Sequence, residues 1–428
     1  MTSLRSTSRG PWAWVPTLYF AQGIPYVVAM TVSVIMYKKL GIANDVIAFY
    51  TSLLYLPWVI KPLWSPFVDM FRTKRFWVVT LQFVIAASLG VVALALPLPA
   101  FFVLTITIFW FMAFSSATHD IAADGFYMLG LAQHQQAAFV GVRSTFFRFA
   151  MLAGQGLLVV FAGNLEQHLN GDIPLAWAVT FWSLAGLFLL FAIYHRFMLP
   201  RPEADRPVRG DASGGVLGEF FRVFKLFFAR PGIGSILLFL LFYRFAEAQL
   251  VKLVTPFLLD PREIGGLGLT TQEVGFVYGT VGVIALLVGG ILGGYLISRH
   301  GLRFWLWPMV FIMHIPDATF VYLSQVQPEN FLVITAAVAL EQFGYGFGFT
   351  AYMLYMILVS EGENKTAHYA ICTGIMALGM MLPGMLSGAV QQAVGYKMFF
   401  IWIVLSTIPS FIVPALVKIP AGFGKKAE

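Results

Sequence analysis

Charged residues and cysteine are scarce in this sequence. Only 11% of its 428 residues are charged, against roughly 25% in a soluble domain, and 59% are hydrophobic. Its one cysteine, Cys372, has no partner for an internal disulfide, and no cluster of Cys and His has the spacing of a zinc site. The composition therefore excludes a soluble globular domain and a disulfide framework, and we expect no metal site.

Motifs of several enzyme classes are also missing. The chain has no His-Glu-x-x-His pair, no Gly-x-Ser-x-Gly element and no Gly-x-x-x-x-Gly-Lys-[Ser/Thr] loop. We therefore expect no enzymatic activity, no cofactor and no ATP-driven transport within this chain. A net charge of +7 would suggest nucleic acid in a soluble protein, but here the basic residues fall in short loops between apolar runs. Nucleic acid is not an expected partner.

Long apolar runs are what the sequence has in abundance. Each is long enough to cross roughly 30 Å of hydrocarbon, and the expected partner of their outer faces is the lipid bilayer. The sequence therefore predicts an all-α membrane protein with twelve transmembrane helices. The predicted spans are 11–37, 46–68, 76–97, 99–125, 137–162, 174–197, 232–258, 272–297, 303–325, 330–358, 367–394 and 396–418.

The longest interruption, 198–231, is rich in Pro and Gly and divides the spans six and six. We expect an N-terminal six-helix bundle over 1–197, a linker, and a C-terminal six-helix bundle over 232–428. Within the linker, 220–228 mixes basic and aromatic residues at helical spacing, which indicates a short helix on the inner leaflet; an extension of the seventh span is the alternative. Most Lys and Arg lie in the loops on the linker side, so both termini are expected to be cytoplasmic.

The two halves resemble each other. Tyr127-Met128-Leu129 recurs as Tyr352-Met353-Leu354, and Asp69, after the second span, corresponds to Ser298, after the eighth, at a similar offset. A repeated offset of this kind indicates a duplicated six-helix unit, which is common in transporters.

The loops 65–75 and 294–303 carry a family resemblance. They are similar to the signature loop of the major facilitator superfamily, Gly-x-[Leu/Ile]-x-Asp-Arg-x-Gly-x-Arg, with Asp69 in the acidic position of the first copy and Ser298 in that of the second. The resemblance implies the major facilitator fold, two six-helix bundles that open to the two sides in turn. In that family the loops act as a cytoplasmic gate, which is assigned here to Asp69, Arg72, Arg299 and Arg303.

A narrower resemblance rests on the segments 22–26, 61–69 and 119–124. Together they resemble the AmpG-type permeases, which import peptidoglycan fragments, and the related acetyl-CoA transporter group. This implies a bacterial cytoplasmic (inner) membrane protein, expected as a monomer, with a small-molecule substrate. Enteric AmpG-type members carry two additional helices that this chain lacks, so free sugars or another amphipathic anion stay open as substrates.

Buried ionisable groups mark a route through the spans, because a carboxylate is costly to place in hydrocarbon. Asp120 and Asp124 are four residues apart and so share one helix face. The alternative to a functional role is that they lie at the cytoplasmic end of the span, where water and a neighbouring Arg satisfy them. Glu247 has Arg244 three residues before it, so either a structural ion pair or a proton carrier fits. Glu341 has no cation nearby in sequence. The predicted proton-coupling residues are Glu341, Glu247, Asp120 and Asp124, whereas His314 and Asp317 are expected to form a packing pair.

The superfamily resemblance implies a substrate site between the bundles, lined by spans 1, 4, 7 and 10. Side chains with flat apolar surface and polar tips suit sugar rings and amides, although they also serve helix packing. The glycines around 23 and from 344 to 348 are expected to let helices bend there. The predicted substrate-binding residues are Gln22, Tyr26, Arg148, Tyr243, Arg244, Gln249, Gln342 and Tyr345.

These observations favour a secondary active transporter, a proton-coupled importer of muropeptides or amino sugars that works by alternating access. The alternative is an antiporter or uniporter of another amphipathic small molecule, a drug-like compound or an acyl-CoA-like anion. Span 5, around Gly154, lacks the Gly-Pro run typical of antiporters in the superfamily. An intramembrane enzyme or structural anchor is the third class, and no motif supports it.

Overall fold

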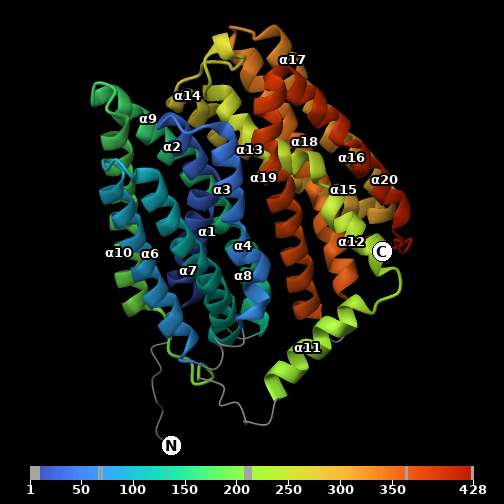
Figure 1. Ribbon diagram of the computed structural model, residues 1–428. Coiled ribbons are helices and arrows are strands. Elements are labelled where there is room, and N and C mark those ends of the chain that lie inside the picture. The colour runs from blue at the N-terminus through green and yellow to red at the C-terminus, as the bar shows by residue number, and fades with distance from the viewer. Residues whose placement is uncertain are drawn as a thin grey trace, which may run out of the picture.

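The computed structural model is almost entirely helical (Figure 1). It describes residues 10–65, 68, 71–131, 133–206, 215–361 and 365–425. The end of the molecule with the turns at 40–43, 169–172 and 327–330 is uppermost in Figure 1 and is called the upper end; the end with 71–73, 131 and 361 is the lower end.

In the described part of the first half, the helices form six membrane crossings, several of them built from short helices in series. The elements are η1 (Pro11–Ala13), α1 (Val15–Val27), η2 (Val28–Val32), α2 (Ser33–Lys39), α3 (Asn44–Leu53), α4 (Leu56–Ile60), η3 (Lys61–Leu63), α6 (Lys74–Ala95), α7 (Phe101–Gly130), α8 (Gln133–Leu152), η4 (Ala153–Leu158), α9 (Val159–His168) and α10 (Ile173–Met198).

The second half repeats this plan after a connecting helix. Its elements are α11 (Gly215–Phe228), α12 (Ile233–Phe242), α13 (Phe245–Leu259), η5 (Arg262–Ile264), α14 (Thr271–Val274), η6 (Gly275–Gly282), α15 (Val283–His300), α16 (Leu302–His314), η7 (Ile315–Asp317), α17 (Ala318–Val326), α18 (Phe331–Ser360), α19 (Lys365–Ser406) and α20 (Ile408–Leu416). Gly395, at φ 71° and ψ 169°, divides α19 into two crossings, because a Cβ would strain that backbone.

Each of the twelve predicted spans thus has a helical counterpart in the described residues. Within the described ranges, nine stretches meet the length and hydropathy of a membrane span, and the bent pair around 229–232 is a tenth. The second predicted span is α3, α4 and η3, interrupted near Tyr55 and by Pro62, which a hydropathy profile does not reveal. The eleventh and twelfth are the two parts of α19 with α20.

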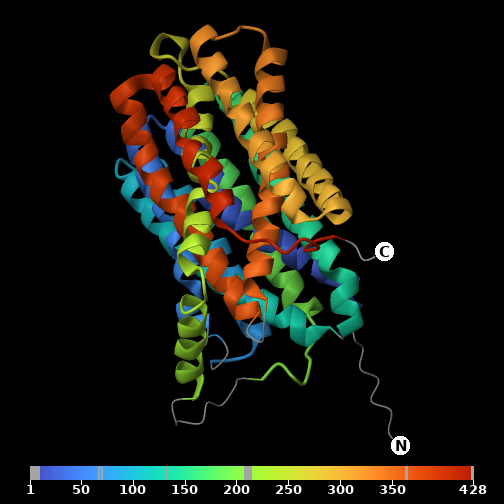
Figure 2. The same cartoon turned by 90° about the vertical axis from the view of Figure 1, so that its right-hand side faces the viewer.

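The helix expected within the linker is present as α11. It meets the axis of the α12–α13 span at 93°, with Gly232 at φ 75° in the turn between them. Figure 2 shows α11 below the other helices, at the lower end. The bend favours a separate helix over a straight extension of the seventh span.

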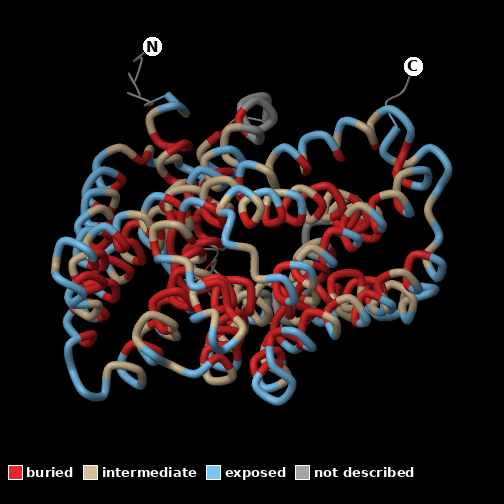
Figure 3. The backbone as a smooth tube through the Cα atoms, turned by 90° about the horizontal axis from the view of Figure 1, so that it is seen from above, coloured by how far each residue is buried: buried red, intermediate tan, exposed pale blue. Residues whose placement is uncertain are grey.

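Burial follows the arrangement of a membrane bundle. Buried residues gather where helices face one another, and exposed residues line the outside (Figure 3). Many exposed side chains are large and apolar, such as Leu190, Ile291 and Leu332. Because lipid tails are as apolar as leucine, an outer surface of this kind suits a bilayer.

Helices α1–α10 lie on one side of the molecule and α12–α20 on the other (Figure 1). They meet along two seams where glycine removes the side chains. A Cβ on Gly279 of η6 would lie 1.9 Å from the carbonyl oxygen of Gln155 in η4, and one on Gly388 of α19 would lie 2.4 Å from that of Asn44 in α3. The halves therefore touch backbone to backbone at both seams.

The glycines of α18 act in the same way. A Cβ on Gly346 would lie 2.0 Å from the carbonyl oxygen of Leu286, and one on Gly344 would lie 2.3 Å from that of Ile312. The helix runs from Phe331 to Ser360 without a break. The helix is therefore not unwound at these glycines, which let α15 and α16 pack closely against it; a bend there stays a prediction.

Candidate functional site

Three carboxylates from three crossings meet inside the second half. Glu247 of α13, Asp317 of η7 and Glu341 of α18 each offer an oxygen, and these oxygens lie within 4.8 Å of one another. All three residues are at most 1% exposed. This group, called the carboxylate triad, joins two predicted proton-coupling residues to one that was expected only to pack against a histidine.

Breaks in two helices place the triad. Arg244, at φ −115° and ψ 22°, separates α12 from α13, so Glu247 lies in the first turn of a new helix. Pro316 interrupts span 9 with the short helix η7, and Asp317 is its last residue. Such breaks put polar side chains and unpaired backbone groups into the interior of a membrane protein.

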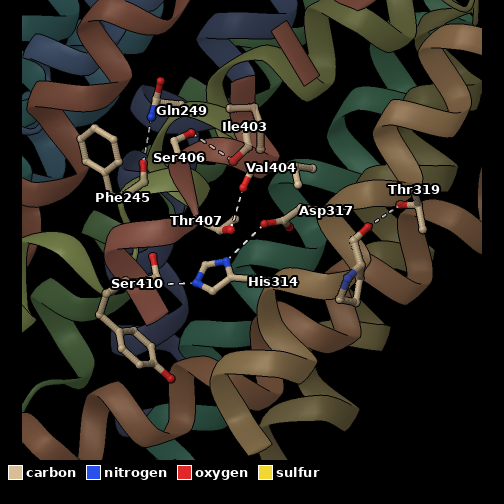
Figure 4. Close-up of polar contacts among 12 residues, drawn as sticks. Phe245, Gln249, His314, Asp317, Thr319, Ile403, Val404, Ser406, Thr407 and Ser410 are labelled. Atoms are coloured by element: carbon tan, nitrogen blue, oxygen red, sulfur yellow. Dashed lines mark hydrogen bonds and ion pairs between the residues drawn. The ribbon is translucent and has the colours of Figure 1, made fainter. Parts of the chain in front are cut away.

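The hydrogen bonds of the triad are incomplete. Both carboxylate oxygens of Glu247 and Oδ1 of Asp317 are buried without a hydrogen-bond partner. His314 Nδ1 lies 3.2 Å from Asp317 Oδ2, as Figure 4 shows, and its other ring nitrogen lies 3.3 Å from the carbonyl oxygen of Tyr243. The expected pairing of His314 with Asp317 is therefore present. Gln342 Nε2 donates to Glu341 Oε2 at 3.0 Å.

Three buried carboxylates this close cannot all be ionised unless a counter-charge lies among them, since like charges repel strongly where water is excluded. The triad must share protons or hold a cation, whose preferred ligands include carboxylate oxygens. Arg244 is the nearest guanidinium in sequence, yet no ion pair joins it to Glu247 among the described residues. Within one helix, the i,i+3 spacing would place Arg244 and Glu247 on the same face. Here α13 begins only at Phe245, so Arg244 lies outside the helix that carries Glu247.

Arg244 instead lies among aromatic rings. Its guanidinium carbon is 4.6 Å from the ring centre of Phe349 and 5.1 Å from that of Tyr345, to whose hydroxyl Nη2 donates a hydrogen bond. Its Nε is buried and has no acceptor. Arg244 is also close enough to Tyr26 and Tyr55 of the first half to interact with them electrostatically.

Aromatic residues of the first half face this arginine. The ring of Tyr26 packs edge-on against those of Trp58, at 5.3 Å, and Tyr55, at 6.4 Å. Lys252 of α13 reaches the same place: its Nζ donates to Thr51 Oγ1 at 3.2 Å and lies 5.2 Å from the ring centre of Tyr55. We call this set of residues from both halves the central cluster: Tyr26, Tyr55, Trp58, Arg244, Lys252 and Tyr345.

The other predicted substrate residues lie elsewhere or have other contacts. Gln22 is buried, and its Oε1 has no donor. The Tyr243 hydroxyl donates to the carbonyl oxygen of Gly348 at 3.0 Å, and Gln249 Oε1 accepts from Trp402 at 2.8 Å, so both serve packing within the second half. Gln342 contacts the triad through Glu341, and Arg148 is exposed.

Asp120 and Asp124 are held by residues of the first half. Asp120 Oδ2 accepts from Trp58 Nε1 at 2.9 Å and lies 3.9 Å from Lys61 Nζ. Asp124 Oδ1 accepts from the Tyr19 hydroxyl at 3.0 Å and pairs with Arg143 Nη2 at 3.1 Å. Both carboxylates thus have a cation and a hydrogen-bond donor, unlike Glu247 of the triad.

A network of polar side chains begins at His119, next to Asp120 in the sequence. Gln82 Nε2 lies 3.1 Å from His119 Nε2, and Gln82 Oε1 lies 2.9 Å from His195 Nδ1. His195 Nε2 is in turn 3.0 Å from the Thr17 hydroxyl. Sequence reasoning missed Gln82 and His195, and polar residues in the middle of apolar spans were the available signal. The network joins four crossings inside one half, so it stabilises that bundle.

The predicted gate lies at the lower end. Asp69 is outside the described residues. Arg72 is exposed, with its guanidinium 5.5 Å from the ring centre of Phe76. Arg299 is exposed and stacks 4.8 Å from the ring centre of Tyr295, and Arg303 is exposed as well. The gating assignment stays a prediction.

Polar contacts between the two halves gather at the upper end instead. Lys38 Nζ pairs with Asp260 Oδ1 at 2.6 Å. Asn44 Nδ2 donates to Gln391 Oε1 at 2.9 Å and to the Tyr396 hydroxyl at 2.8 Å. These residues line a small hollow of about 380 Å³ at the upper surface. This group was not predicted from the sequence, because its members come from distant parts of the chain.

A similar contact lies on the other side of the upper end. Glu166 Oε2, at the end of α9, accepts from the Thr271 hydroxyl at 2.8 Å and pairs with Lys39 Nζ at 3.2 Å. Gln167 Nε2 donates to Gln272 Oε1 at 2.8 Å. The upper end is therefore sealed between the halves by two polar groups, one beside each glycine seam.

Comparisons with known proteins agree with this architecture. A model described as the BT1 family matches residues 22–323. Over 410 residues the chain is 26% identical to the anhydromuropeptide permease of Escherichia coli, covering 92% of this chain and 77% of that protein. It is 24% identical over 408 residues to a putative transporter, AmpG 4, of Rickettsia conorii, covering 92% and 94%.

Solved structures are similar in fold at low identity. The D-xylose–proton symporter superimposes with a TM-score of 0.68 at 13% identity, covering 96% of this chain and 98% of that one. The nucleoside transporter NupG gives a TM-score of 0.65 at 16% identity, covering 95% and 98%.

Proposed function

The chain belongs to the BT1 family and is a multi-pass transporter with the major facilitator fold, not an enzyme, and on this basis we propose that it imports peptidoglycan-derived muropeptides or amino sugars together with protons. The fold class predicted from the sequence is confirmed by these comparisons. The observation that carries the proposal is that Arg244 of the central cluster and Glu247 of the carboxylate triad lie three residues apart, at the break where α13 begins.

The central cluster suits a substrate with sugar rings and an anionic group. Tyr26, Tyr55 and Trp58 present flat apolar faces with polar tips, which pack against sugar rings and bond their hydroxyls. Arg244 offers a planar fork that matches a carboxylate, and Lys252 adds a second positive charge. Muropeptides and N-acetylmuramic acid carry both features, and one relative is named an anhydromuropeptide permease.

Coupling follows from the charge of the triad. Arg244 interacts electrostatically with Glu247, so an ionised triad competes with an anionic substrate for the same guanidinium. A proton on the triad removes that competition and leaves Arg244 to the substrate. Proton and substrate therefore bind together and leave together, as a symporter requires.

The direction of transport rests on the distribution of charge. If the lower end, with its Arg-rich loops and α11, faces the cytoplasm, then both termini are cytoplasmic and the sealed upper end faces outward. We propose that this arrangement is a state from which substrate leaves toward the cytoplasm. We further propose that the protein lies in the bacterial inner membrane, like the bacterial permease it resembles, as a monomer in which each chain carries its own pathway.

The test is uptake into proteoliposomes. Anhydromuropeptides, N-acetylglucosamine, N-acetylmuramic acid and an acyl-CoA are offered in turn, with an imposed proton gradient, with an imposed sodium gradient and with neither. We expect accumulation of a muropeptide or an amino sugar only with the proton gradient. Accumulation driven by sodium would assign the triad to a metal cation, and equilibration without accumulation would make the protein a uniporter. Uptake of acyl-CoA alone would overturn the substrate class.

A further inference from the structure

A cavity of about 560 Å³ lies at the lower end of the first half, away from the central cluster. It is formed by the beginning of α6, the end of α10 and the segment that follows α10. Figure 1 shows these two helices at the edge of the molecule that faces away from α12–α20. Its lining residues are Thr73, Arg75, Phe76, Val79, Thr80, Phe83, Arg196 and Arg201.

Three arginines are among the residues that line this cavity. Arg75 is held in place, because its Nε donates to the carbonyl oxygen of Leu199 at 3.3 Å and its Nη2 donates to that of Arg196. Arg196 and Arg201 are exposed, and neither has an ion-pair partner among the described residues. Two positive charges that line one cavity without an ion-pair partner are unfavourable, so Arg196 and Arg201 favour a negatively charged ligand.

The carboxylate beside this cluster has another use. Asp205 Oδ1 accepts from the backbone N–H of Lys74 at 2.6 Å, and Oδ2 accepts from that of Arg75 at 3.0 Å. It therefore satisfies the free N–H groups at the start of α6, as a capping residue does, and is not paired with Arg196 or Arg201. The local charge at the cavity stays positive.

The rest of the cavity is an apolar track along one face of α6. Phe76, Val79, Thr80 and Phe83 follow helical spacing, and with a rise of about 1.5 Å per residue the track from Thr73 to Phe83 is about 15 Å long. Phe76 and Phe83 are 44% and 38% exposed, on the surface that contacts the bilayer. A positive mouth at a helix end with an apolar track leading into the membrane matches a molecule with an anionic head and a hydrocarbon tail.

We propose that this cavity binds the phosphate group of an anionic phospholipid such as phosphatidylglycerol, with Arg75, Arg196 and Arg201 around the head and an acyl chain along Phe76 and Phe83. Clusters of arginines at helix ends near a bilayer surface recognise anionic lipid heads in this way. The lipid joins α6 to the segment 199–206, and so fixes the start of the connection between the halves. The site is independent of the transported substrate.

The experiment measures lipid binding to the purified full-length protein in detergent. Phosphatidylglycerol, phosphatidylcholine with the same acyl chains, and inorganic phosphate are titrated while the thermal unfolding temperature is followed. We expect phosphatidylglycerol alone to raise the unfolding temperature. Arg196→Gln with Arg201→Gln should weaken the apparent affinity for phosphatidylglycerol about 25-fold, since each basic residue at a bilayer surface contributes about fivefold.

A matched control removes two positive charges elsewhere on the protein. Lys397→Gln with Lys418→Gln changes the net charge equally at exposed positions of the second half, outside α11, and should leave the lipid effect unchanged. If the double arginine variant does not yield folded protein, Arg201→Gln alone, which lies outside the helices, should still lower the affinity about fivefold. An arginine variant that responds to phosphatidylglycerol like the wild type overturns the proposal. A wild type that responds equally to phosphatidylcholine or to inorganic phosphate also overturns it.

Discussion

Lys38 of α2 and Asp260, just after α13, form a 2.6 Å ion pair that joins the two halves at the upper end. The side chains are only 15% and 6% exposed, so the pair is largely removed from water. Such a contact must break whenever the upper end opens. Because an ion pair removed from water is costly to split without new partners, it stabilises the sealed state relative to the open one.

Asp260→Asn should therefore open the upper end more often. The substitution keeps the shape of the side chain but removes the charge that Lys38 requires, and we expect the population open at the upper end to rise about tenfold, or ~1.4 kcal/mol. Distances between spin labels on α2 and α14 would report this change. Lys397→Met removes an exposed charge at the same end and serves as control. Unchanged distances in Asp260→Asn would show that the pair does not hold the seal.

Glu341→Gln should separate substrate exchange from accumulation. Glutamine imitates the protonated carboxylate at nearly the same shape, and Gln342 can remain beside it. The variant should exchange substrate down its own gradient but fail to accumulate it when a proton gradient is imposed. Glu263→Gln, at an exposed position near the upper surface, is the control.

Glu247→Gln tests the division of roles within the triad. Because Arg244 is not paired with Glu247, this variant should fold normally, contrary to what an Arg244–Glu247 ion pair would require. Normal accumulation in Glu341→Gln with loss of accumulation in Glu247→Gln would make Glu247 the proton carrier. If both accumulate normally, coupling does not use the triad.

Arg244→Lys should discriminate between substrates by charge. Lysine keeps the positive charge but loses the planar fork and the stacking on Phe349 and Tyr345, so uptake of an anionic muropeptide should fall about 10- to 100-fold. Uptake of neutral N-acetylglucosamine should fall much less, and its rate in the same vesicles is the internal control. Equal losses for both substrates would indicate that Arg244 serves only the packing of α13 against α18.

Gly279→Ala should destabilise the contact between η4 and η6. The new Cβ would lie 1.9 Å from the carbonyl oxygen of Gln155, so the halves must move apart, at a cost of about 1–3 kcal/mol. The unfolding temperature should fall. Gly186→Ala in α10 is matched in chemistry, but its Cβ meets no atom within 4 Å, and it should be neutral or stabilising. Similar stability of the two variants would mean that the seam tolerates side chains.

The positions of the helical spans were predictable from the sequence, because each span is decided locally by a run of apolar residues. The triad was predictable only in part. Glu247 and Glu341 stood out as acids in apolar spans, but Asp317 was assigned to His314 alone, since sequence spacing reveals neighbours on one helix and not side chains from three helices. The His314–Asp317 contact is present, and Asp317 faces the other two acids as well.

Contacts between segments far apart in the chain could not be predicted from the sequence for the same reason. Lys38 and Asp260 are more than two hundred positions apart, and each is unremarkable in its own loop. The Arg244–Glu247 spacing was misleading because a break in the helix is not visible in a hydropathy pattern. The two aspartates of span 4 show the opposite case, because a cation from a neighbouring span was expected near them. Asp120 lies beside Lys61, and Asp124 pairs with Arg143.

The glycine seams bear on how fast the protein can change state. Interlocked side chains must leave one set of rotamers and enter another when two surfaces slide, and each such step adds friction. Around Gly156 and Gly279 the surfaces in contact are backbone, which has no rotamers to change. The two bundles can therefore move against each other at the seams without rearranging side chains. The polar contacts at the upper end are then the interactions that must break for that end to open. The rate of turnover is then set by breaking the polar contacts at the upper end and by the binding and release of substrate and proton, and not by motion at the glycine seams.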